Sequence, residues 1–159
     1  MEEIKKILAP TDFSPLSLAG LQHALEIAGS QGMELIAYHV IHKEEMLPYY
    51  RMQAEAAPSR NVHSIADLIE ERKARLAEFL RQNFADLSRK TRIRVEVDIG
   101  IPHKRIVEKA REEGATMIVM STHGRTGLLH MLLGSVTEKV IRRASCPVLS
   151  IRPEVRIAA

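Results

Sequence analysis

Short apolar runs alternate with stretches of helical periodicity along the chain. The runs predict strands over residues 4–10, 33–41, 92–99, 116–120 and 147–151, and the periodicity predicts helices over roughly 15–31, 64–83, 103–113 and 135–144. Such alternation is typical of strand–helix units around a mainly parallel sheet. Met117–Met120 is apolar on both faces, as in a covered central strand, whereas Arg92–Ile99 alternates apolar and charged residues, as in a half-exposed edge strand. The pattern therefore predicts an α/β protein.

Two segments lie outside this pattern. Residues 43–62 have no clean period, and we expect a long and mobile connection there; residues 153–159 are expected to form a short tail. No internal repeat, low-complexity tract or linker divides the chain. Residues 1–159 are therefore expected to form a single domain.

Composition narrows the possible surroundings and partners. The net charge is only +3, basic and acidic residues alternate, and aromatic residues make up 4%, which does not favour nucleic-acid binding. No apolar run approaches the ~20 residues that span a bilayer, and the N-terminus lacks a signal-peptide pattern. Cys146 is the single cysteine, which fits a reducing compartment. We expect a cytoplasmic protein that binds neither nucleic acid nor membrane.

The strongest chemical signal is a pair of glycine-containing blocks. Ser121–Gly124 follows the fourth predicted strand, and Gly134–Glu138 opens the last predicted helix. Ligands of open parallel sheets bind outside the carboxyl ends of the strands, and a helix N-terminus offers free amides to phosphate. The same residues also suit a structural role, because Ser135 and Glu138 have capping-box spacing and glycines are common in turns. The spacing alone leaves both readings open.

A second signal lies at the end of the first strand. Asp12 follows Pro10 and Thr11, where a carboxylate can contact ribose hydroxyls or a bound metal; its alternative role is an Asx turn or a helper cap before the next helix. If the first and fourth strands are neighbours, Asp12 and the Ser121–Gly124 block face one crevice. His39 and His42 lie on opposite faces of the second strand, so they cannot share a metal.

Four blocks together resemble the universal stress protein family: Ala9–Ser14, Met120–Arg125, Gly134–Glu138 and Cys146–Leu149. The resemblance implies a three-layer α/β/α open sheet of five parallel strands in the order 3-2-1-4-5, Rossmann-like and of the adenine nucleotide α-hydrolase type. It implies the ATP-binding branch, because the motif Gly-x-x-Gly-x9-Gly-Ser/Thr is nearly intact. It also implies ATP with Mg²⁺ or Mn²⁺, and a homodimer formed through Pro147–Ile151.

The resemblance also implies roles for single residues. Asp12 and Val40 would lie near the nucleoside, with the Val40 backbone on adenine, and Asp12 could reach a metal carried by ATP. Met120 and Ser121 would contact ribose or base, and His123 and Gly124 the phosphates. The full expected set is Pro10, Thr11, Asp12, Val40, Met120, Ser121, His123, Gly124, Arg125, Gly134, Ser135, Val136 and Thr137.

One departure and one basic residue affect this expectation. Ser121 replaces the first glycine of the motif, so its side chain could fill the hollow. Arg125 is placed by sequence to reach a terminal phosphate, although a solvated loop arginine is an equal alternative.

Three functions remain at this point. The first is an ATP-binding, nucleotide-dependent regulatory or stress-response dimer. The second is a dimeric protein-interaction module without nucleotide. The third is a slow ATPase, for which His123 and Arg125 are the candidates and no clear general base is present.

Overall fold

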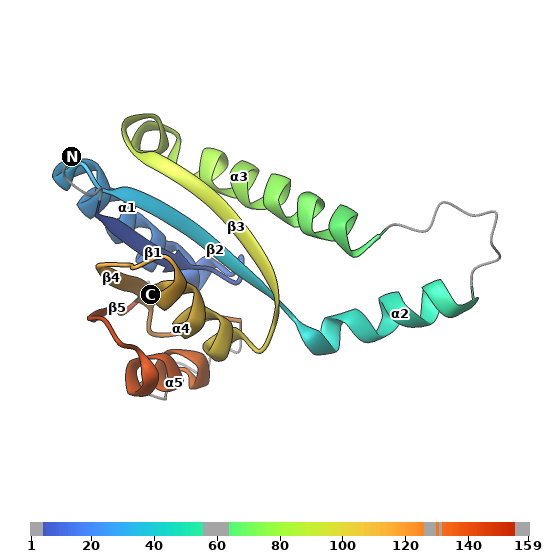
Figure 1. Ribbon diagram of the computed structural model, residues 1–159. Helices are drawn as coiled ribbons and strands as arrows, with labels where there is room; N and C mark the ends of the chain where they lie inside the picture. Colours follow the sequence, from blue (N-terminus) through green and yellow to red (C-terminus); the bar gives the residue numbers. More distant parts are fainter. Residues whose placement is uncertain (1–4, 56–63, 126–129, 131, 155–159) are drawn as a thin grey trace, which may run out of the picture.

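The computed structural model describes residues 5–55, 64–125, 130 and 132–154. Five parallel strands form one sheet in the order β3-β2-β1-β4-β5, which confirms the predicted topology (Figure 1). The strands are β1 (Lys6–Pro10), β2 (Glu34–His42), β3 (Arg92–Gly100), β4 (Met117–Ser121) and β5 (Val148–Ile151). Because β1 continues to β2 on one side and lies beside β4 on the other, the strand order reverses between β1 and β4.

Helices cover both faces of the sheet. A 3-10 turn, η1 (Pro15–Ser17), leads into α1 (Leu18–Gln31), which packs with α3 (Ile65–Lys90) on one face; α4 (Pro102–Glu112) and α5 (Ser135–Arg143) cover the other (Figure 1). Each face has its own apolar cluster, because alternate strand residues point to opposite sides. The three-layer α/β/α architecture is thus confirmed.

The segment predicted as a connection over 43–62 contains a helix, so that prediction was wrong in part. A 3-10 turn, η2 (Lys43–Glu45), is followed by α2 (Met46–Glu55), which extends away from the sheet (Figure 1). Met46 is buried against Ile41 and Val97, whereas Leu47 and Tyr50 are 58% and 47% exposed. Among the described side chains of α2, Met46 is buried and Tyr49 partly buried, which agrees with a sequence that has no regular apolar repeat. Residues 56–63 lie outside the described residues.

The next helix begins as expected and ends later. Ser64 caps α3 by accepting a hydrogen bond from the Asp67 amide, and the Asp67 carboxylate accepts one from the Ser64 amide, which completes a capping box. The predicted end at Asn83 coincides with a break in the helical backbone at Phe84, after which the chain turns helical again to Lys90. Within the described residues, no helix is both long and apolar enough to cross a membrane.

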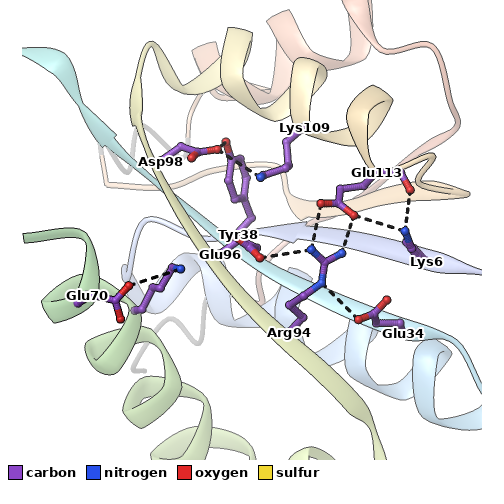
Figure 2. A network of polar contacts seen from close by, with 10 residues as sticks. Lys6, Glu34, Tyr38, Glu70, Arg94, Glu96, Asp98, Lys109 and Glu113 are labelled. Carbon is purple, nitrogen blue, oxygen red and sulfur yellow. Dashed lines mark hydrogen bonds and ion pairs between the residues drawn. The ribbon is translucent and has the colours of Figure 1, made fainter. Parts of the chain in front are cut away.

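The polar side chains of β3 are paired rather than simply solvated. Arg94 contacts Glu34 and Glu96, each at 3.3 Å, and binds Glu113 at the end of α4 with its two Nη atoms, at 3.0 and 2.5 Å (Figure 2). Lys6 adds a contact to Glu113 at 3.4 Å. The Arg94 hydrogen bonds lower the pKa of Glu113 from 4.5 to about 2. The network ties β1, β2 and β3 to α4.

A second polar group lies further along the same face. The Tyr38 hydroxyl donates to the Asp98 carboxylate at 2.7 Å, and Lys109 of α4 lies 3.6 Å from that carboxylate (Figure 2). Arg105 of α4 pairs with it at 3.0 Å. Burial and the neighbouring Asp98 raise the pKa of Tyr38. The fully buried Tyr38 ring is thereby held in one position behind the pocket described next.

Candidate functional site

A cavity of about 390 Å³ opens at the carboxyl ends of β1, β2 and β4. All the residues predicted for the site line it: Pro10, Thr11, Asp12, Val40, Met120, Ser121, His123, Gly124, Arg125, Gly134, Ser135, Val136 and Thr137. Its position is where the order of the parallel strands reverses, the usual ligand site of open α/β sheets. The structure thus brings the two sequence signals together in one pocket.

The turn after β1 positions the acidic residue. The Thr11 hydroxyl lies 2.7 Å from that of Ser17 and accepts the Phe13 amide at 3.1 Å, while Asp12 Oδ1 accepts the Ser14 amide at 3.0 Å. This is the Asx turn considered as the alternative role for Asp12. Phe13 takes a positive φ of 65°, which a non-glycine residue adopts only when its surroundings hold it there.

Aromatic packing holds Phe13 in that conformation. Its ring centre lies 4.5 Å from that of His39 and 5.4 Å from that of Phe79, and the Arg75 guanidinium lies 4.4 Å above it. The Asp12 carboxylate therefore sits on a turn that is anchored to β2 and α3.

The loop after β4 is joined directly to Asp12. Asp12 Oδ2 accepts the Arg125 amide at 2.6 Å, and a Cβ on Gly124 would overlap the same carboxylate. Only glycine allows this approach. The two stretches that the sequence predicted to face one crevice are thus in contact.

The serine that replaces the motif glycine does not block the pocket. Ser121 Oγ accepts the Gly20 amide at 2.9 Å, and its carbonyl accepts the Thr137 hydroxyl at 2.9 Å. Gly20 lies in the first turn of α1, whose amides have no acceptor within the helix, so Ser121 supplies one from β4. Its side chain is occupied at α1 rather than extended into the cavity.

The start of α5 forms the far wall. Its N-cap is Gly134, which makes no side-chain capping bond and whose amide donates to Thr122 O at 2.7 Å. The capping box considered for Ser135 and Glu138 is therefore not formed, and Ser135 is exposed at the first helical position. The amides in the first turn of α5 have no acceptor within the helix and carry a partial positive charge, so this helix end suits an anion. Gly127, the other glycine of the loop after β4 that would suit a turn, lies outside the described residues.

Three histidines line the pocket, each with a local hydrogen bond. His39 is buried and its Nδ1 lies 2.8 Å from Thr11 O, so Nδ1 carries the proton; burial lowers the pKa of His39, which keeps it neutral. His42 Nδ1 accepts the Glu44 amide, and His123 Nδ1 lies 2.8 Å from the Thr122 hydroxyl. No group of three acidic, histidine or cysteine residues within the described part of the chain could hold a metal ion by itself.

Arg125 lies at the rim and is already paired. Its Nη1 lies 3.2 Å from Glu45 Oε1, and its Nε donates to Asp12 O at 3.1 Å. Arg125 is thus an exposed loop arginine, as one of the two interpretations had it, but one that is paired at the rim rather than only solvated. Contact with a phosphate stays a prediction.

Sequence reasoning missed several lining residues: Ser17, Tyr38, His39, His42, Glu44, Glu45, Pro102 and Ile106. Residues 42–45 follow the carboxyl end of β2, so the rule that pointed to Asp12 and Ser121 could have found them. Pro102 and Ile106 belong to α4, which follows the edge strand β3, and no local signal brings them to this pocket.

The pocket has two chemically distinct parts. Tyr38, Val40, Ile106 and Met120 belong to one apolar cluster and give it an apolar wall. The other part is polar. Asp12 contributes a carboxylate, the loop at Gly124 brings its backbone close to that carboxylate, and the start of α5 contributes helix amides. The fold and site define a Rossmann-like α/β protein with a ligand pocket at its strand-order reversal.

Comparison with known proteins gives the family. The sequence model of the universal stress protein family matches residues 3–152. Universal stress proteins MJ0577 and MJ0531 of Methanocaldococcus jannaschii are 32% and 36% identical over 153 and 148 residues, covering 93% of this chain and 94% and 82% of theirs. The chain belongs to the universal stress protein family.

Solved structures agree with the fold. The structure of MJ0577 superposes with a TM-score of 0.72 over 94% of this chain and 96% of its own, at 32% identity. A universal stress protein from Archaeoglobus fulgidus, solved in complex with dAMP, has a TM-score of 0.58 over 95% of this chain and 99% of its own, at 20% identity. Nucleotide binding thus occurs among proteins of this fold.

Proposed function

We propose that this protein is a cytoplasmic, ATP-binding regulatory universal stress protein that acts as a homodimer. The observation that carries the proposal is the two-part cavity: an apolar wall that includes Val40 and Met120, and a polar end formed by Asp12, Gly124 and the start of α5. The apolar part suits an adenine ring, and the polar end suits ribose and phosphates. The dAMP complex of the Archaeoglobus fulgidus relative supports a nucleotide as the ligand class.

A divalent ion would enter with the nucleotide. Each carboxylate oxygen of Asp12 accepts one backbone amide and keeps a further lone pair, and Asp12 lines the cavity. Mg²⁺ is commonly held by one or two carboxylates together with phosphate oxygens. Asp12 would therefore be the protein's contribution to Mg²⁺ or Mn²⁺ bound with ATP.

The dimer would form through β5. This strand ends the sheet and is paired only on its β4 side within the described residues, and Leu149 is 39% exposed. An open, partly apolar edge strand is a surface that a second copy can cover.

ATP binding is tested on purified protein by acid extraction and chromatography of bound nucleotide, followed by thermal unfolding with Mg-ATP. At ATP concentrations about 100 times Kd, binding adds about 2.7 kcal/mol and should raise Tm by roughly 5–10 °C. Gly124→Asp should abolish the rise, because it places a second carboxylate against Asp12 and the phosphates. The proposal would be refuted if the wild type carried no extractable nucleotide and also showed no Tm shift with Mg-ATP.

A matched control uses the same substitution elsewhere. Gly114 is exposed beyond α4, before the amino end of β4, and a Cβ there meets open space. Its φ of +60° is one that Asp tolerates. Gly114→Asp should keep the ATP-dependent Tm rise, whereas a protein-interaction module without nucleotide predicts that neither substitution matters.

A further inference from the structure

The pair formed by Glu45 and Arg125 joins two sides of the pocket rim. Arg125 follows Gly124 in the loop after β4, and Glu45 is the last residue of η2 after β2. The guanidinium is oriented toward Glu45 by its Nε–H bond to Asp12 O. Since α2 begins at Met46, the ion pair holds the first turn of that helix to the loop proposed to surround the phosphates.

Among the described residues, α2 is otherwise attached through Met46 and the partly buried Tyr49. Met46 is buried with Ile41 and Val97, but Leu47 and Tyr50 are exposed. The Tyr49 hydroxyl is buried without a hydrogen-bond partner among the described residues, which disfavours the docked position. Because these apolar contacts hold α2 only weakly, loss of the ion pair between Glu45 and Arg125 should loosen the helix.

A phosphate of a bound nucleotide can compete with the carboxylate that Arg125 now contacts. A nucleotide phosphate offers several charged oxygens, and the planar guanidinium binds such groups with two parallel hydrogen bonds. The side chains of Arg125 and Glu45 are 51% and 35% accessible. Because an ion pair this exposed to solvent is weak, it costs little to replace Glu45 by another partner.

We infer that the phosphate chain of the nucleotide and Glu45 compete for Arg125, and that phosphate binding releases η2 and α2 from the rim. The inference rests on the proposed function, since it needs a phosphorylated ligand in this pocket. Linkage makes the effect reciprocal: a change that loosens η2 from Arg125 must strengthen phosphate binding by the same factor. The universal stress domain would then report its ligand through the position of α2.

The first test compares Glu45→Gln with Glu44→Gln by calorimetric titration of ATP and of adenosine. Both variants remove one negative charge from the pocket lining, but among the described residues Arg125 pairs with the Glu45 side chain and not with that of Glu44. Glu45→Gln should bind ATP about two- to fivefold more tightly, the range expected for an exposed ion pair, and Glu44→Gln should gain less. Adenosine affinity should not change. An equal gain in both variants would show general charge repulsion and overturn the inference.

The second test measures hydrogen exchange over residues 43–55. Without ligand, Glu45→Gln should exchange about two- to fivefold faster there than the wild type. ATP should produce the same increase in the wild type and none in the variant, and adenosine should produce none in either. ATP binding to the wild type with unchanged exchange over 43–55 would overturn the inference and leave the proposed function intact. Absence of ATP binding in all three proteins would overturn both.

Discussion

Ser121 provides the sharpest test of how the pocket is built. The substitution Ser121→Ala removes the oxygen that accepts the Gly20 amide at 2.9 Å and changes little else. Both residues are buried, so the amide of the first turn of α1 loses its acceptor where water does not reach it. An unsatisfied buried donor costs about 1–3 kcal/mol, and we expect a loss of about 1–2 kcal/mol in the free energy of unfolding. For a chain of this length, that lowers Tm by about 2–8 °C.

Urea denaturation and calorimetric ATP titration on the same samples check the prediction. ATP affinity should stay within about twofold of the wild type, because Ser121 Oγ is directed at α1 and a one-unit change in log Kd needs about 1.4 kcal/mol. Ser30→Ala, which removes an exposed hydroxyl bonded within its own helix, should change stability by no more than about 0.5 kcal/mol. Unchanged stability of Ser121→Ala, or lost ATP affinity with stability retained, would refute the reasoning.

Two further predictions concern stability in acid and the dimer. The pKa of Glu113 lies at about 2 instead of 4.5, so its ionised form stabilises the fold fully above pH 4.5 and this contribution is lost as pH falls toward 2. With Arg94 34% exposed, we expect Glu113→Gln to cost about 1–2 kcal/mol at pH 7, and a urea series should show that difference shrinking below pH 4.5; a constant difference would contradict it. Leu149→Asp should convert a dimer into monomers in light scattering after size exclusion, while the exposed change Ser30→Asp should not; a monomeric wild type would refute dimerisation.

Much of the fold could be predicted because its signals are local. Strand and helix identity follows from the period of apolar residues, which is a property of neighbouring positions. The break at Phe84 and the late end of α3, by contrast, have no such signature. The helix α2 was missed because its sequence has no apolar stripe to detect; of its described side chains, those buried lie in the first turn.

Residues of the pocket were predictable where they follow the ends of central strands. Asp12 and the Ser121–Gly124 block lie at such ends, and the sheet order brings them together. Pro102 and Ile106 reach the same cavity from a helix that follows the edge strand β3, which only the packing of α4 against the sheet determines.

The sequence by itself determined the five strands, the four helices that cover the sheet and the position of a glycine-containing crevice after the first and fourth strands, since these depend on local periodicity and on residues that only certain turns accept. The tertiary structure decided where the side chains point: Ser121 toward α1, Arg125 toward Glu45, and His39 toward Thr11. Each of these contacts joins residues that are distant along the chain. Which residues meet depends on how the helices and strands pack together, and a local sequence pattern cannot predict that.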